Sequence, residues 1–208
     1  MGKFWYLTPI QHRRFACPAT AAEVVSIEKT STFALIPPQT LSQAAKLPIS
    51  RIPMVTKIEL AQDWLPRYTG MPLGEFGEYV LLTNFIGYVR KFAEKFGCHV
   101  YGEDRPMQAA TNSAGLSIIN FGIGSPNAAT VMDLLTAQHP KAVLFLGKCG
   151  GLKRSTEIGN FILPIAAIRG EGTSDDYLPH LVPALPSFKL HKFVSEKLVE
   201  RNLDYRTG

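Results

Sequence analysis

Four short, strongly apolar segments recur along this chain of 208 residues, and helical patterns separate them. The predicted strands are residues 78–82, 117–121, 142–146 and 161–168. The predicted helices are residues 57–64, 85–96, 126–138 and 187–202. The third strand is apolar at every position, which is typical of a parallel strand covered by helices on both faces. The pattern therefore predicts an α/β fold with a mainly parallel, buried sheet.

Residues near the ends of these segments predict where the elements begin and end. Pro66 is expected to end the first helix, because proline lacks the amide hydrogen that a helix interior needs. Asn84 is placed to cap the second helix, and Gly97 to end it. Pro164 indicates an edge or a bulge within the last strand.

Residues 1–53 differ from residues 54–208 in composition. They hold six of the fifteen prolines and carry a net charge of +4, against +1 for the remainder. We expect 1–53 to be a poorly ordered extension, with a transit peptide and a start at Met54 left open. Because 54–208 is nearly neutral, a nucleic-acid partner is not expected. No apolar run reaches the ~18–20 residues of a membrane span, so no membrane is expected either.

The three cysteines, Cys17, Cys98 and Cys149, are widely spaced and form no metal-binding pattern. They indicate neither a disulfide framework nor a structural zinc site, and a reducing, cytoplasmic setting is expected. Cys149 lies in a glycine-rich loop and could be a nucleophile. A buried thiol is the favoured interpretation, because no His or Asp is placed to activate it.

Three loops at the ends of predicted strands carry the candidate chemistry, because ligands of open α/β sheets bind beyond the carboxyl ends of the strands. In the first loop, 122–127, glycines allow a ligand to approach the backbone, and Ser125 is placed to cap a helix whose N-terminus favours an anion. This loop matches neither the dinucleotide fingerprint nor the P-loop, so a plain strand–helix turn is an equal alternative.

The other two loops add charged side chains. In 147–151, Lys148 could bind a phosphate or a carboxylate. In 169–176, Arg169 offers a bidentate fork to an anion, and Glu171 could accept hydrogen bonds from sugar hydroxyls. A polar exposed turn is the alternative for this loop. Asp175 and Asp176 are disfavoured as a metal pair, because adjacent carboxylates usually diverge.

Five longer segments resemble bacterial AMP nucleosidases of the short form, within the purine nucleoside phosphorylase superfamily. They are 63–69, 75–84, 121–129, 141–151 and 163–174. The resemblance covers about 54–208 and implies that the N-glycosidic bond of AMP is hydrolysed to adenine and ribose 5-phosphate. It implies a mixed, mainly parallel sheet of the nucleoside phosphorylase type with flanking helices, and a dimer-based homo-oligomer that is a hexamer in full-length members. It also implies no metal and no organic cofactor.

The resemblance also implies roles for single residues, through the motifs in which they lie. Arg105 opens a segment that resembles Arg-Gly-Met-x-x-x-Thr, whose Arg reaches a phosphate in the neighbouring subunit's site. Gly122–Gly124 resembles Gly-Met-Gly, which lies against the ribose, and 147–150 resembles a phosphate and ribose loop. The expected substrate-binding residues are Asn84, Arg105, Gly122, Ile123, Gly124, Lys148, Arg169, Glu171 and Thr173.

The sequence also departs from the phosphorylase pattern. Phe145 stands where phosphorylases have an Arg, and 83–87 stands where they have a Gly-Asp-Pro-x-Arg phosphate loop. Both losses fit a hydrolase that needs no orthophosphate. The catalytic Asp and the ribose-binding Glu of the family are expected beyond residue 208, so the domain is expected to be incomplete at its C-terminus. The alternatives are a catalytically incomplete nucleotide-binding fragment and a purine nucleoside phosphorylase.

Overall fold

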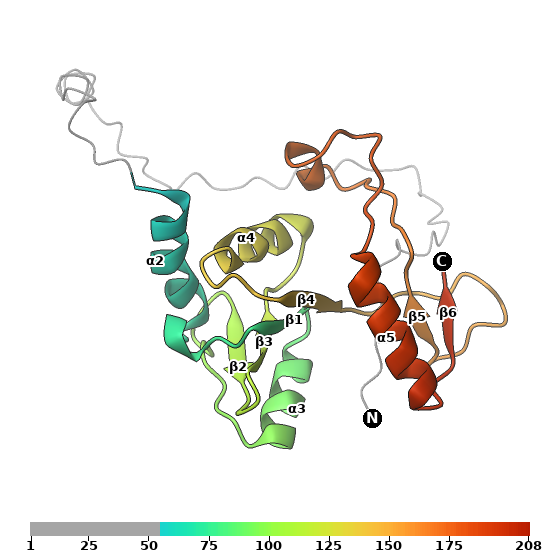
Figure 1. The fold of residues 1–208 in the computed structure, drawn as a ribbon, viewed down its shortest axis with the longest axis horizontal. Coiled ribbons are helices and arrows are strands. Elements are labelled where there is room, and N and C mark those ends of the chain that lie inside the picture. The colour runs from blue at the N-terminus through green and yellow to red at the C-terminus, as the bar shows by residue number, and fades with distance from the viewer. Residues whose placement is uncertain (1–54) are drawn as a thin grey trace, which may run out of the picture. The chain divides into compact units, whose positions relative to one another are not determined.

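The computed structural model describes residues 55–208, and the extension expected over 1–53 lies outside them. Four strands form one sheet in the order β2-β3-β1-β4, and two more form a second sheet (Figure 1). The strands are β1 (Tyr79–Thr83), β2 (Gln108–Thr111), β3 (Leu116–Asn120), β4 (Ala142–Leu146), β5 (Phe161–Leu163) and β6 (Tyr205–Thr207). β1 pairs in parallel with β3 and β4, and β2 pairs antiparallel with β3. The predicted α/β fold with a mainly parallel sheet is confirmed.

Residues 55–208 also form four α-helices and two short 3₁₀ helices, two of them before β1 and the others between strands. They are α2 (Lys57–Thr69), η2 (Leu73–Glu75), α3 (Ile86–Phe96), α4 (Ser125–Leu135), η3 (Thr173–Asp176) and α5 (Phe188–Glu200). None of the helices within 55–208 is both long enough and apolar enough to cross a membrane.

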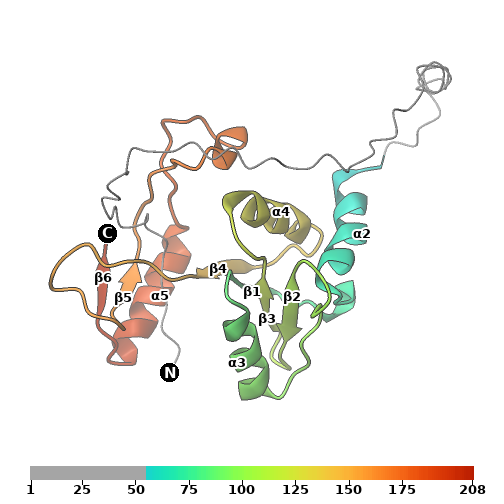
Figure 2. The same cartoon turned by 180° about the vertical axis from the view of Figure 1, so that it is seen from behind.

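Alternate residues of the central strands pack on opposite faces of the four-stranded sheet. Val80 and Ile119 belong to the cluster that also holds buried side chains of α2 and α4. Ile118, one residue before Ile119, packs instead with the buried residues of α3. Figure 2 shows the same arrangement from behind, with α3 on one face and α2 and α4 on the other. Each fully buried Val or Ile contributes about 1.5–3 kcal/mol, so this double cover anchors the sheet.

Helix α2 continues through Pro66 to Thr69, so the expectation that Pro66 ends it is wrong. Thr56 and Glu59 form a capping box at its start, and Gly70 ends it at a φ of 70°. Proline removes its own amide donor and crowds the carbonyl four residues earlier, whereas the helix on either side of Pro66 buries Leu65 and Thr69, both 0% exposed. That burial outweighs the lost hydrogen bond.

The starts of α3 and α4 differ by one residue from the predicted caps. The N-cap of α3 is Phe85 and has no side-chain cap, so the capping role predicted for Asn84 is wrong. Thr83 Oγ1 instead accepts a hydrogen bond from the Phe85 amide at 3.2 Å. The N-cap of α4 is Gly124, at a φ of 101°, and Ser125 is the first helical residue rather than the cap. A positive φ is unfavourable for serine, which explains the shift.

The strand predicted over 161–168 ends at Leu163, because Pro164 follows and has no amide to donate to a ladder. Beyond it only Ala167 makes a further bridge, to Ala184. β5 pairs in parallel with β6, a strand that the sequence pattern did not predict. β2 was not predicted either, because its sequence Gln-Ala-Ala-Thr holds only one β-branched residue and no aromatic one.

Candidate functional site

Three parallel strands deliver their following loops to one edge of the sheet. Thr83 at the end of β1 is in register with Asn120 of β3 and with Leu146 of β4. The residues that follow, Asn84, Phe121 and Gly147, therefore leave the sheet side by side. The Phe121 amide still donates to the Thr83 carbonyl at 3.0 Å. The chain goes from β1 to β3 on one side and then to β4 on the other, which is the switch point where such sheets bind ligands.

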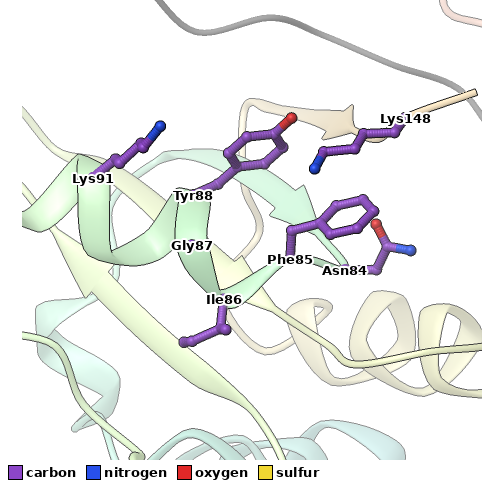
Figure 3. A pocket seen from close by; sticks show the side chains of 7 residues that line it. All are labelled: Asn84, Phe85, Ile86, Gly87, Tyr88, Lys91 and Lys148. Carbon is purple, nitrogen blue, oxygen red and sulfur yellow. The ribbon is translucent and has the colours of Figure 1, made fainter.

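A cavity of about 320 Å³ opens at this edge (Figure 3). Its lining comes from the start of α3 and from the loop after β4: Asn84, Phe85, Ile86, Gly87, Tyr88, Lys91 and Lys148. The volume is at the lower end of the range for small-ligand sites. The structure thus brings together two of the predicted site residues, Asn84 and Lys148.

The charge and aromatic character of the cavity come from four side chains. Lys148 Nζ lies 4.3 Å from the centre of the Phe85 ring and 5.6 Å from that of Tyr88, within cation–π range. The two rings meet edge to face at 5.7 Å. Burial raises the pKa of the Tyr88 hydroxyl. Lys91 adds a second cation, so the cavity suits an anion with an apolar part.

Asn84 contributes a hydrogen-bond acceptor that no group within residues 55–208 uses. Its Oδ1 is buried and has no hydrogen-bond partner. Buried polar atoms are almost always hydrogen-bonded, so an orphaned acceptor in the wall of a cavity points to a donor on a ligand. Figure 3 shows the Asn84 amide beside the Phe85 ring.

The glycine loop before α4 leaves the same edge but does not line the cavity. Gly122 and Gly124 have φ angles of 80° and 101°, and the Gly122 amide donates to Asn120 Oδ1 at 3.3 Å. Ile123 is 83% exposed, and its carbonyl accepts from Asn127 Nδ2. This loop is therefore pre-shaped by its own hydrogen bonds and open to solvent.

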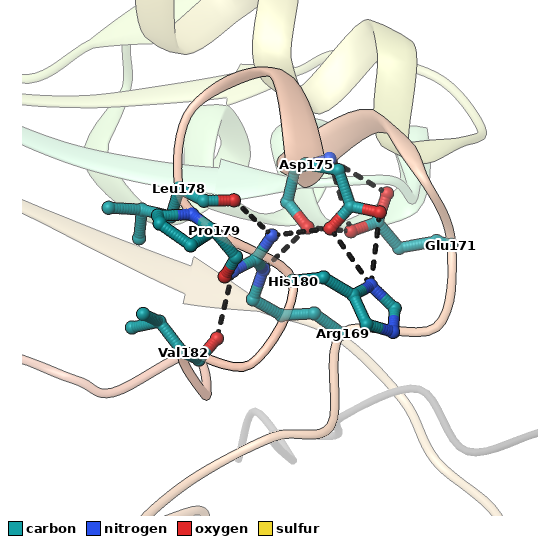
Figure 4. A network of polar contacts seen from close by, with 8 residues as sticks. Arg169, Glu171, Asp175, Leu178, Pro179, His180 and Val182 are labelled. Carbon is teal, nitrogen blue, oxygen red and sulfur yellow. Dashed lines mark hydrogen bonds and ion pairs between the residues drawn. The ribbon is translucent and has the colours of Figure 1, made fainter.

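Arg169, a predicted substrate-binding residue, is engaged within its own loop in this structure. All five of its N–H donors are used within the chain (Figure 4). The acceptors are Ser174 Oγ, Asp175 Oδ1 and the carbonyls of Leu178, Pro179 and Val182, at 2.6–2.9 Å. The residue is 7% exposed. In this arrangement no donor is left for an anion, so Arg169 holds the loop together instead.

Of the other predicted site residues in this loop, Thr173 contacts α4 and Glu171 accepts hydrogen bonds within the loop. Thr173 Oγ1 lies 3.0 Å from Ser125 Oγ, in the first turn of α4. Glu171 accepts hydrogen bonds from the amide and the hydroxyl of Ser174. The Ser174 hydroxyl is the main cause of a lowered pKa at Glu171, so this carboxylate is ionised at neutral pH and has no proton to give.

Arg105 lies apart from the cavity, in the turn between Gly102 and β2. Its side chain is about half exposed and pairs with Asp104 at 3.5 Å. Its carbonyl accepts from Gln108 Nε2. Over residues 55–208 no three His, Cys, Asp or Glu side chains group closely enough to hold a metal ion.

The sequence pattern did not predict five residues of the cavity lining, Ile86, Gly87, Phe85, Tyr88 and Lys91, and the last three supply its aromatic rings and its second cation. Their spacing of three places them on one face of α3, directly after the end of β1. That combination of helical spacing and strand end was the available signal.

The chain is similar in sequence to a known family and to several characterised proteins. The family described as the phosphorylase superfamily matches residues 76–208. The AMP nucleosidase of Escherichia coli K12 is 27% identical over 168 residues, which cover 63% of this chain and 34% of that protein. The uridine phosphorylase of Treponema pallidum is 29% identical over 125 residues, covering 58% and 48%. The chain thus spans about a third to a half of the length of these curated relatives.

Two solved structures also resemble this chain in fold. The AMP nucleosidase of Bacteroides thetaiotaomicron matches with a TM-score of 0.71 at 55% identity, covering 74% of this chain and 67% of that one. The purine nucleoside phosphorylase of Toxoplasma gondii matches with a TM-score of 0.61 at 17% identity, covering 66% and 58%. The second match shows the shared fold alone.

Proposed function

We propose that this chain, which belongs to the phosphorylase superfamily, hydrolyses the N-glycosidic bond of AMP to adenine and ribose 5-phosphate. The 55% identity to an AMP nucleosidase of known structure supports this activity. The observation that carries it in the structure is the cavity at the carboxyl ends of β1 and β4, which joins two lysines, two aromatic rings and an orphaned acceptor.

The cavity residues suggest how a nucleotide would be held. Lys148 and Lys91 attract the phosphate, and the free N–H groups at the N-terminus of α3 add a favourable partial charge, which no acidic residue in the first turn offsets. Asn84 Oδ1 accepts a hydrogen bond from the ligand. The glycines at 122 and 124 allow the ribose to approach the backbone before α4, with Ile123 between them.

The environment of Phe145 favours hydrolysis over phosphorolysis. Its ring lies 5.9 Å from that of Phe121 and packs against the core. An apolar side chain at this position offers no charge to orthophosphate. Water is therefore the proposed nucleophile, attacking a ribosyl group with oxocarbenium character. Among the described residues we assign the general acid to none: Glu171 has a lowered pKa, and Asp175 is bonded to Arg169.

Assembly and location complete the proposal. The protein acts as a homo-oligomer in which Arg105 of one subunit reaches the phosphate in a neighbouring site. Its half-exposed position and single weak ion pair leave it free to do so. A reducing, cytoplasmic setting is supported by Cys98 and Cys149, both free thiols. No nucleic acid or membrane is a proposed partner.

Adenine release from AMP without added phosphate tests the activity. Ribose 5-phosphate as the sugar product supports it. Phosphate-dependent formation of a 1-phosphorylated sugar shows a phosphorylase instead, and binding of AMP without turnover shows a nucleotide-binding module.

Substitution of Lys148 tests the proposed site. Lys148→Ala is expected to raise KM for AMP by about tenfold to a hundredfold, since a hydrogen bond to a charged group contributes about 1.5–3 kcal/mol. Adenosine, which lacks the phosphate, should be affected much less. Lys192→Ala is the matched control, because Lys192 pairs loosely with Glu196 at 3.8 Å on α5. Equal effects of Lys148→Ala on both substrates would remove Lys148 from the phosphate site.

A further inference from the structure

The loop 169–182 is folded around one buried charge. The Arg169 side chain is only 4% exposed, and burial of an unpaired guanidinium would be very unfavourable. The structure compensates for this burial with five hydrogen bonds, one of them to the Asp175 carboxylate at 2.6 Å. That carboxylate also contacts His180 Nδ1 at 3.1 Å. Figure 4 shows these groups converging on the guanidinium from residues up to thirteen positions later in the chain.

The same loop contacts α4 at both of its ends. Thr173 meets Ser125 in the first turn, immediately after the glycine loop. Four residues further on, Tyr177 donates to Asp133 Oδ2 at 2.9 Å, near the end of α4. Asp133 in turn accepts from Lys57 of α2 at 2.7 Å. The loop therefore has two defined attachments to the helix that follows the glycine loop.

We propose that Arg169 is a positioning residue for nucleotide binding: by closing the loop 169–182, it holds Thr173 and Glu171 against the start of α4. The inference rests on the proposed function for its substrate. Arg169 itself does not touch the ligand, because each of its donors is already engaged. Its effect reaches the nucleotide through Thr173, Ser125 and the glycine loop beside them.

The geometry of the guanidinium gives this proposal a specific consequence. Arginine presents five donors in a planar fork, whereas lysine presents three on one atom. Lysine at 169 keeps the charge, but its single ammonium group cannot bond all five acceptors together: the Ser174 hydroxyl, the Asp175 carboxylate and the three carbonyls. A positioning role therefore predicts that Arg169→Lys fails to rescue, while a simple charge contact with the ligand predicts that it does rescue.

The experiment compares Arg169→Lys and Arg169→Met with the wild type in the intact protein. KM and kcat are measured for AMP and for adenosine, and hydrogen exchange of 169–182 is measured without ligand. We expect both variants to raise KM by about tenfold, by the same factor for both substrates, with faster exchange in the loop. Arg206→Lys is the control, because Arg206 also bonds a loop residue, Ser155, but is exposed.

Other outcomes overturn the proposal. Arg169 binds the phosphate directly if its variants raise KM for AMP but not for adenosine, or if Arg169→Lys keeps the KM of the wild type. Faster exchange with unchanged KM and kcat shows that the loop has no role in binding. If the Arg169 variants do not fold, Thr173→Val replaces them, because it removes only the contact with Ser125; it is expected to raise KM by about threefold to tenfold for both substrates.

Failure of the proposed activity is recognised separately. If the wild type releases no adenine from AMP, the proposed function fails, and calorimetric binding of AMP and adenosine replaces KM in the same comparison. Equal weakening of both ligands in the Arg169 variants then supports the positioning role, and unequal weakening overturns it.

Discussion

Substitution of Gly102 by alanine tests the close packing at the turn that carries Arg105. Gly102 has a φ of 78°, and a Cβ there would lie 2.3 Å from the Met107 carbonyl oxygen and 2.4 Å from that of Thr69. Both neighbours are backbone atoms, one from the segment before β2 and one from the end of α2. Neither can rotate away as a side chain could, so one of the two segments must move.

The expected cost follows from two separable effects. The left-handed conformation costs about 1–2 kcal/mol for a residue with a Cβ. Overpacking in a well-packed region adds about 1–3 kcal/mol. Gly102→Ala should therefore lower the free energy of unfolding by about 2–5 kcal/mol, and the melting temperature by about 10 °C for a chain of this size.

Gly97→Ala separates the two effects. Gly97 ends α3 at a φ of 63°, but a Cβ there meets no atom within 4 Å. Only the conformational cost applies, so its melting temperature should fall by about 3 °C. Thermal melts followed by circular dichroism, with urea titrations to check that m is unchanged, provide the comparison. Equal shifts for the two variants would refute the reasoning, because they would mean that the contacts at Gly102 relax without cost.

Two further predictions concern polar contacts near α4 and β1. A hydrogen bond from Lys57 is the main cause of the lowered pKa of Asp133, so Asp133 contributes to stability near neutral pH and loses this contribution as the pH falls below its unfolded pKa of about 4. The difference in melting temperature between wild type and Asp133→Asn should therefore shrink from pH 6 to pH 3. A difference that stays constant over this range would contradict the prediction. Thr83→Val leaves the Phe85 amide without its acceptor at the edge of the cavity and should lower the free energy of unfolding in urea by about 1–3 kcal/mol. Thr83→Ser keeps the hydroxyl and should lower it clearly less. Equal decreases for the two variants would point to packing rather than to the hydrogen bond.

The strands of the parallel core could be predicted from the sequence because each is a run of apolar residues of strand length. β4 was predicted with its observed bounds, and β1 and β3 each differ by one residue. β2 and β6 were not predicted because they are short, and because pairing with a neighbouring strand, rather than their own composition, makes them strands. Pro66 shows the same limit for helices, because the burial of Leu65 and Thr69 outweighs a local preference.

The candidate site could be predicted only as far as the strand ends define it. Asn84 and Lys148 lie together because two parallel strands end in register, and the sequence pattern predicts such strands. The direction of the Arg169 guanidinium could not be predicted. Whether an arginine in a polar loop faces a ligand or its own backbone depends on where five acceptors lie in space, and three of those acceptors are carbonyls that no side-chain pattern reveals.

The central position of β1 has a consequence for how the protein is made. Tyr79 pairs with Leu116 and also with Ala142, about sixty residues later in the chain. At about 5–20 residues per second, a ribosome completes β4 roughly 3–13 s after β1. During that interval one edge of an apolar strand has no partner, while α3 and the β2–β3 hairpin can already assemble around the other. Lys148 follows β4, so the cavity is completed only when the last strand of this sheet has docked.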